Sequence, residues 1–238
     1  GLVGSEMCIR DSYPARDYNF NNILASHEFE HERLSVLYRM MKNDSFTVVS
    51  TPAAAFQLTM PPEKLAVRTI RLDRNSPIDT DELAIRLNGA GYRRCDMVES
   101  CGQFALRGGI VDIYAPSMHP VRIELFGDEV DRMGYFSLES QRFTGEKTDS
   151  IEIPPTLEVI LGDEERRILR ESVTRQISRV KGSAAEQTLR AELDALENSQ
   201  DVNFADKYLP LIFSEGCCLT DYADEIIAVS YTHLRAHE

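Results

Sequence analysis

Two acidic clusters have the residue types of a Mg²⁺ site in an enzyme that hydrolyses nucleoside triphosphates. Residues 159–164 read Val-Ile-Leu-Gly-Asp-Glu, and residues 128–131 read Asp-Glu-Val-Asp. Such carboxylates work beside a Gly-Lys-Ser/Thr loop, whose lysine reaches the terminal phosphates. The sequence has no Gly-Lys dipeptide. We therefore interpret the first cluster as a strand that leads into the acidic start of a helix, and the second as a hairpin turn at Gly127 and Asp128.

Other catalytic and metal-binding patterns are also missing from the sequence. The five cysteines include no Cys-x-x-Cys pair, and there is no Gly-x-Ser-x-Gly nucleophile motif. His27 and His31 could share one helix face, but no third ligand follows at a metal-binding spacing. We predict no catalytic residue, no cofactor and no metal in this chain, which by itself is then not an enzyme.

Composition narrows the class of protein further. The formal net charge is −13, whereas a broad phosphate-binding surface needs clustered Lys and Arg. Any contact with nucleic acid therefore requires a local patch or another part of a larger polypeptide. No apolar run approaches the length of a membrane span, no secretory signal is visible, and unpaired cysteines fit a reducing compartment. These features predict a cytoplasmic protein without a membrane partner.

The two ends of the chain differ from the rest. Residues 1–12 and 229–238 show no amphipathic period and no helix caps, and they resemble translated sequencing-adapter tails. We exclude both from the fold prediction and expect the native protein to continue in both directions.

The intervening chain divides at two proline pairs, at residues 61–62 and 154–155. Residues 13–61 alternate helix, buried strand and helix, the pattern of an open α/β sheet. Residues 62–155 combine one helix with a run of antiparallel strands, which predicts a compact α+β domain. Residues 156–228 return to helices and short strands. The predicted fold class is α/β with an inserted α+β domain.

Periodicity and capping residues place the individual elements. Amphipathic spacing predicts helices, and alternation or β-branched content predicts strands. The predicted helices cover residues 27–43, 79–88, 163–181, 184–198 and 204–213, and one more begins at Thr51 and Pro52 and ends at Pro61. The predicted strands cover residues 46–50, 66–72, 92–98, 110–114, 121–126, 130–136, 150–153, 157–161 and 226–229.

A β-ribbon within residues 102–129 is the most informative stretch. Between residues 121 and 126 apolar side chains alternate with Arg122 and Glu124, so one face of the ribbon is charged. We expect Asp112, Arg122 and Glu124 to project from the ribbon, Arg93, Arg94 and Arg107 to flank the sheet, and Phe104 and Tyr114 to add aromatic surface. Arginine and tyrosine are enriched at the hot spots of protein interfaces. The ribbon therefore predicts a docking surface.

These stretches resemble a known family. The segments Gly-Tyr-Arg-Arg-Cys-Asp-Met-Val-Glu (91–99), Gly-Gln-Phe-Ala-Leu-Arg-Gly-Gly-Ile-Val-Asp-Ile-Tyr (102–114), Pro-Val-Arg-Ile-Glu-Leu-Phe-Gly-Asp-Glu-Val (120–130) and Glu-Ser-Gln-Arg (139–142) are similar to the UvrB-like N-terminal module of bacterial transcription-repair coupling factors. The resemblance implies a truncated RecA/UvrB-like open sheet that flanks a small antiparallel-sheet domain. Residues 13–61 would end the first α/β half, and residues 156–228 would start the second.

The same resemblance implies a function. The domain of residues 62–155 would bind the damage sensor UvrA, while the flanking module would have lost its ATPase activity. ATP, Mg²⁺, DNA and RNA polymerase would be bound by downstream domains of a full-length ATP-dependent DNA translocase. By position, the resemblance assigns UvrA contact to Arg94 and Arg107, with Phe104, Asp112 and Tyr114 as neighbours.

Two other interpretations stay open. The chain could be a fragment of UvrB, the excision-repair helicase subunit that verifies damage, or an unrelated α/β protein-interaction module. UvrB favours Phe-Arg-Val-Arg-Gly where this chain reads Phe-Ala-Leu-Arg-Gly, so Ala105 stands at a UvrB arginine. We also expect the outer parts to be less stable than residues 62–155, because a sheet without its first strands exposes edges and apolar surface.

Overall fold

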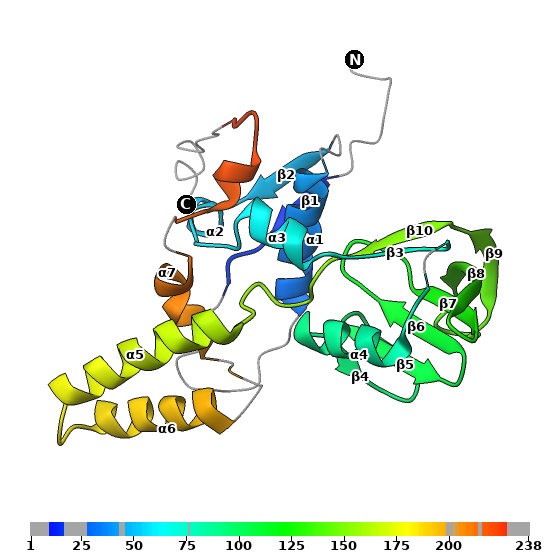
Figure 1. The fold of residues 1–238 in the computed structure, drawn as a ribbon. Helices are drawn as coiled ribbons and strands as arrows, with labels where there is room; N and C mark the ends of the chain where they lie inside the picture. Colours follow the sequence, from blue (N-terminus) through cyan, green and yellow to red (C-terminus); the bar gives the residue numbers. More distant parts are fainter. Residues whose placement is uncertain are drawn as a thin grey trace, which may run out of the picture.

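The computed structural model describes residues 10–16, 28–42, 46–75, 77–198, 202, 204–213 and 216–227. Within them the chain is mixed α/β, with small sheets and several helices (Figure 1). The elements outside the central domain are β1 (Arg10–Tyr13), α1 (Glu28–Met41), β2 (Thr47–Ser50), α2 (Pro52–Ala55), α3 (Pro62–Arg68), α5 (Asp163–Arg179), α6 (Ala184–Asn198), α7 (Leu209–Ile212) and two 3₁₀ turns, η1 (Ala205–Tyr208) and η2 (Leu219–Tyr222). β1 and β2 pair in parallel.

The central domain is built on a six-stranded sheet with strand order β4-β5-β6-β7-β8-β9. Its strands are β4 (Arg93–Arg94), β5 (Gln103–Arg107), β6 (Ile110–Tyr114), β7 (Val121–Phe126), β8 (Glu129–Phe136) and β9 (Phe143–Lys147). All neighbours are antiparallel except β4 and β5. A separate antiparallel pair, β3 (Ile70–Asp73) with β10 (Ser150–Ile153), carries the chain into and out of this domain. The helix α4 (Thr80–Gly89) packs on one face of the sheet (Figure 1).

Two tight hairpins set the register of the sheet. Arg107 pairs with Ile110 across Gly108-Gly109, and Phe126 pairs with Glu129 across Gly127-Asp128. The first glycine of each loop has a positive φ, 61° at Gly108 and 63° at Gly127, while the second loop residue does not. That pattern is typical of a type II′ turn, which requires glycine at its first central position. The hairpin predicted at Gly127 is confirmed, and both turns lie at the same end of the sheet.

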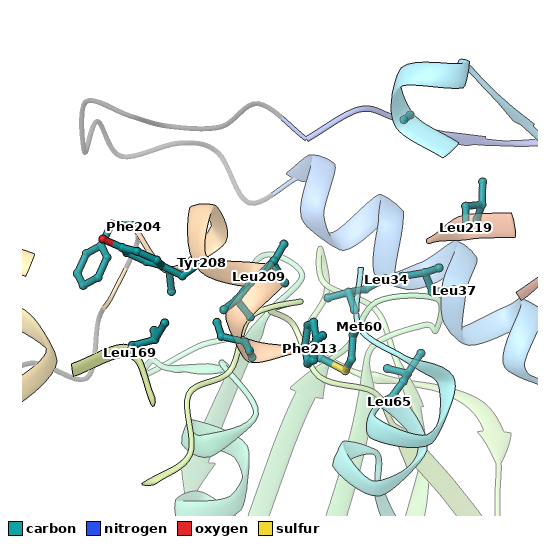
Figure 2. Close-up of a cluster of buried hydrophobic side chains, with 14 of the residues drawn as sticks. Leu34, Leu37, Met60, Leu65, Leu169, Phe204, Tyr208, Leu209, Phe213 and Leu219 are labelled. Carbon is teal, nitrogen blue, oxygen red and sulfur yellow. The ribbon is translucent and has the colours of Figure 1, made fainter. Parts of the chain in front are cut away.

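The buried apolar side chains form two main clusters. One draws its residues from 13–65 and from 159–219, and Figure 2 shows Leu34, Met60 and Leu169 among its members. The other lies entirely within residues 70–153 and packs α4 against the sheet. The chain therefore builds one core from two segments that are distant in sequence, and a second core from the segment between them.

A buried ion cluster joins the two halves of the first core. The side chain of Glu158 is fully buried and accepts hydrogen bonds from Arg33 Nε at 2.5 Å and from Thr59 Oγ1 at 2.6 Å, and it forms an ion pair with Arg16. Its backbone N–H donates to the carboxylate of Glu30 at 2.6 Å. These bonds link residues before the central domain to a residue just after it.

The same cluster predicts a pH effect at the neighbouring Asp206. Burial raises the pKa of Asp206 to about 6, and the charges of Glu30 and Glu158 add to the rise against the effect of Arg16. A carboxyl whose pKa is higher when folded stabilises the fold at low pH and loses that contribution as pH rises through the folded pKa. We expect Asp206→Asn to raise the unfolding free energy at pH 7 by about 1–3 kcal/mol and to leave it unchanged at pH 3.5. Urea unfolding at both pH values checks this, and an equal gain at both would contradict the assignment.

Several predicted helices agree with the structure. The helices predicted over 79–88, 163–181 and 184–198 appear as α4, α5 and α6, and the one over 27–43 appears as α1 within its described residues. The acidic cluster at Asp163 and Glu164 opens α5, where Glu165 accepts the N–H of Gly162 at 3.1 Å. Residues 204–213 form the 3₁₀ turn η1 followed by the short α7 rather than one helix.

Three predicted strands are wrong in whole or in part. Residues 157–161 are irregular, because the N–H of Glu158 bonds to a side chain instead of a ladder partner. The strand predicted over 66–72 begins only at Ile70, since Pro62 starts α3 rather than ending a helix, and proline is well suited to a first turn. Ile226 and Ile227 form no strand and are exposed, while residues 228–229 lie outside the described range.

Three further differences concern the strands. The strand predicted over 92–98 is reduced to Arg93–Arg94, because the Gln103 side chain accepts the N–H groups of Glu99 and Ser100 and holds this segment as a loop. β9 has no counterpart in the prediction, as its sequence Phe-Thr-Gly-Glu-Lys is mostly polar. At the N-terminus, the structure places residues 10–12 in β1, although the fold prediction left residues 1–12 out.

Candidate partner-binding face

The register of the central sheet separates its two faces. One face turns Phe104, Val111, Ile113, Val121 and Ile123 toward α4 and is fully buried. The opposite, outer face carries several rows of side chains that run across the strands. Paired positions place Ala105, Asp112, Arg122 and Gly134 in one row, and Arg107, Ile110, Glu124 and Arg132 in the next, nearer the hairpin turns.

Phe104 lies on the buried face. Its side chain is 0% exposed and belongs to the core beneath α4. This corrects its predicted place in an arginine and aromatic surface. Strand alternation is the reason, because Phe104 sits between two outer-face residues, Gln103 and Ala105.

Asp112 and Arg122 do not project into solvent as the sequence predicts. They lie directly opposite each other on β6 and β7, and both are buried. Asp112 Oδ1 accepts from Arg122 Nε at 2.6 Å and Asp112 Oδ2 accepts from Arg122 Nη2 at 2.8 Å. The Arg107 guanidinium forms an additional ion pair with Asp112 Oδ2. Hydrogen bonding to Asp112 raises the pKa of Arg122 further, so the Arg122 guanidinium stays charged in this fork-to-fork pair.

Two loops cover the half of the outer face that is distant from the hairpin turns. The loop of residues 95–101 packs Val98 against Ala105 and Phe136, with Tyr114 partly buried beside them. The loop of residues 137–142 is tied to the first one because Gln141 Nε2 donates to Val98 O at 3.1 Å. Tyr114 therefore has only part of its surface available.

Arg122 is held by the second of these loops. Its Nη1 donates to Gln141 O at 2.8 Å, and its guanidinium lies 4.8 Å from the ring centroid of Phe136. Gln141 has a positive φ of 57°, an uncommon conformation for a residue other than glycine. These bonds fix Arg122 within the covered half.

The half of the outer face near the hairpin turns is open. There the Arg107 side chain is 40% exposed, and Phe126 is 84% exposed. Glu124 and Arg132 form a partly exposed ion pair at 2.9 Å, and Arg132 lies 3.8 Å from the ring centroid of Phe143. We call this half, formed by Arg107, Ile110, Glu124, Phe126 and Arg132, the open half. One sequence feature points to the open half: Phe126 is apolar but occupies the position after Arg122 and Glu124 on the polar side of the β7 alternation.

Arg94 and Arg107 are not brought together. Arg94 pairs with Phe104, three residues before Arg107, which separates the two backbones by about 10 Å along the strand. Because paired residues share a face, Arg94 emerges on the core side at the edge of the sheet, whereas Arg93, paired with Gln103, emerges on the outer side. Both arginines are exposed. The register of β4 with β5, which alternation within β5 does not give, puts Arg93 rather than Arg94 on the face of Arg107.

The described residues contain no group of three or more His, Cys, Asp or Glu side chains placed to hold a metal ion. No described helix combines the length and the apolar composition needed to cross a bilayer.

Comparison with known proteins defines the class first. Residues 70–158 match the model of the UvrB interaction domain, a range that runs from β3 past β10 and includes the whole six-stranded sheet. The central domain is a UvrB interaction domain.

The relatives of the chain then define the family. It is 32% identical to the transcription-repair-coupling factor of Bacillus subtilis over 237 residues, covering 95% of this chain and 20% of that protein. It is 29% identical to that of Myxococcus xanthus (78% of this chain, 15% of that protein) and 33% identical to that of Mycobacterium bovis (73% and 14%). The chain belongs to the transcription-repair-coupling factor family and spans about a fifth or less of the length of these relatives.

Proposed function

We propose that this chain is the UvrA-binding module of a transcription-repair coupling factor, which recruits nucleotide excision repair to stalled RNA polymerase. The observation that carries the proposal is the match of the UvrB interaction domain to the residues that form the six-stranded sheet. The chain itself supplies contact, not catalysis. Parts of the protein outside this chain would bind ATP, Mg²⁺, DNA and RNA polymerase and drive translocation, and the parts flanking the central domain would derive from RecA-like halves.

We place the contact on the open half of the outer face, with Arg107 at its centre. Only Nη2 of the Arg107 guanidinium has a partner within the described residues, so its other nitrogens are available to a carboxylate of a partner. Phe126 supplies the exposed aromatic side chain that Phe104 cannot. Arg94 stays in the proposal as a second contact at the sheet edge.

Replacing Arg107 by alanine tests the contact. A truncated arginine at the centre of an interface typically weakens binding by about 10- to 100-fold, and we expect a loss of this size for UvrA. The measurement is biolayer interferometry of the 238-residue chain against immobilised UvrA, with circular dichroism to verify the fold. Arg71→Ala is the matched control, because Arg71 is an exposed, ion-paired arginine on β3, outside the six-stranded sheet.

Variants of Arg93 and Arg94 at the sheet edge test how far the contact surface extends. Arg94→Glu and Arg93→Glu are compared in the same assay, and the larger loss identifies the side of the sheet edge that faces UvrA. Binding of the Arg107→Ala and Arg94→Glu variants at the strength of the parent, with both folded, would show that the surface is misplaced. Failure of the parent chain to bind UvrA would overturn the proposed function. It would also contradict the alternative that the chain is a UvrB fragment, which should bind UvrA as well.

A further inference from the structure

Asp112 cannot touch a partner directly, yet it is bonded to the arginine at the centre of the open half. The Asp112 side chain is 0% exposed. Oδ1 accepts from Arg122, while Oδ2 accepts from both Arg122 and Arg107. Within the described residues, all the hydrogen bonds to this carboxylate thus come from two arginines, one on each neighbouring strand.

The two arginines differ in freedom. Arg122 is buried, donates to the carbonyl of Gln141 and lies over the ring of Phe136. Arg107 is 40% exposed and has no bonded partner except Asp112 within the described part of the chain. Asp112 is therefore fixed on one side by the buried Arg122, and on the other side it holds the partly exposed side chain of Arg107.

The strand register explains how Arg107 reaches Asp112. The residue directly opposite Asp112 on β5 is Ala105, and Arg107 is the diagonal neighbour two residues further on. Diagonal neighbours lie within reach of long side chains. Ala105 is small and packed under Val98 and Phe136, so it leaves the Asp112 carboxylate to Arg107.

We propose that Asp112 is a positioning residue, which orders the Arg107 side chain for partner binding through a charge network anchored at Arg122. The proposal rests on the proposed function of the open half. An arginine loses rotamer freedom when it is fixed at an interface, and a side chain ordered in advance loses less on binding. Removal of the Asp112 charge should therefore weaken binding by roughly 2- to 10-fold through Arg107 alone.

Two variants separate positioning from stability. Asp112→Asn removes the charge that holds Arg107, whereas Arg122→Met removes the other side of the buried pair and leaves Asp112 bonded to Arg107. Both should lower resistance to urea, because each leaves a buried charge with fewer partners. Asp112→Asn should weaken binding to UvrA more than Arg122→Met does, because only Asp112→Asn removes the carboxylate that bonds to Arg107. In a double-mutant cycle, Arg107→Ala should cost less affinity in the Asp112→Asn background than in the parent.

A measurement on the parent chain keeps the proposal testable if Asp112→Asn fails to fold. The ¹⁵N relaxation of arginine side chains should show Arg107 restricted in motion and Arg93 free. An Arg107 as mobile as Arg93, or Asp112→Asn binding like the parent while Arg107→Ala binds weakly, would overturn the positioning role. Normal binding by Arg107→Ala would instead refute the placement of the proposed contact.

Discussion

Replacement of Glu158 by alanine is expected to lower the unfolding free energy of the chain by about 3–5 kcal/mol, the usual cost of removing one partner from a buried ion pair. Glu158 is fully buried and is the shared acceptor of Arg16, Arg33 and Thr59. Without it, the largely buried guanidinium groups of Arg16 and Arg33 lose the carboxylate that they share. The stability lost should be that of the first core, whose two segments, within residues 13–65 and 159–219, this cluster joins.

Urea unfolding with hydrogen exchange checks this expectation. Amides of α1, which carries Arg33, should lose protection, while those of β5 to β7 in the central domain should keep it. Glu164→Ala is the matched control, since Glu164 pairs with Arg167 on the exposed side of α5 and its removal should have no measurable effect. If Glu158→Ala and Glu164→Ala unfold at the same urea concentration and keep the same amide protection, the cluster does not hold the first core together.

The same carboxylate predicts acid sensitivity. Burial alone would raise the pKa of Glu158, but Arg16 and Arg33 beside it hold the pKa below its usual value. A carboxyl with a depressed folded pKa stabilises the protein fully above its unfolded pKa, about 4.3, and this contribution is lost as pH falls through the folded value. Glu158→Ala should therefore flatten the decline of stability below that pH, whereas the effect of Asp206 falls at higher pH, as the pH rises through about 6.

Replacement of Phe104 by alanine is expected to destabilise the central domain by about 3–5 kcal/mol, the cost of deleting a fully buried aromatic ring. Phe104 packs in the core beneath α4 and has no exposed surface. UvrA binding should fail in this variant because the sheet unfolds, not because a contact is lost. Thermal unfolding and UvrA binding measured on the same sample separate the two effects.

Phe104→Leu and Phe126→Ala complete that test. Leucine keeps most of the apolar volume at position 104, so this variant should fold and bind UvrA at nearly parental strength. Phe126→Ala should keep the stability of the parent, because the side chain is 84% exposed, and should lose affinity. A Phe104→Leu variant that folds but fails to bind UvrA would show that Phe104 contributes to the contact itself.

Local patterns in the sequence predict most of the central domain and the two long helices that follow it. Alternation along β7 gives its buried and outer faces, and the loop Gly127-Asp128 gives its hairpin. Helical spacing and the glycine between them give α5 and α6. These features depend on interactions between residues that are near in sequence, so the sequence states them directly.

The surroundings of the outer face were decided by the tertiary structure alone. Alternation assigns Asp112 and Arg122 to the charged face, but it does not show that the loops of residues 95–101 and 137–142 fold over half of that face. Burial then turns two expected surface charges into an internal pair and leaves Arg107 and Phe126 as the accessible groups.

The sequence by itself determined the class of protein, the absence of a Gly-Lys phosphate loop and the strands that carry the proposed docking surface. Tertiary structure decided which of the candidate residues are exposed: Arg107 is, while Phe104 and Asp112 are not. The physical reason is that exposure depends on contacts between segments far apart in the chain, such as Gln141 with Val98 and Glu158 with Arg33. No local pattern of residues encodes those contacts.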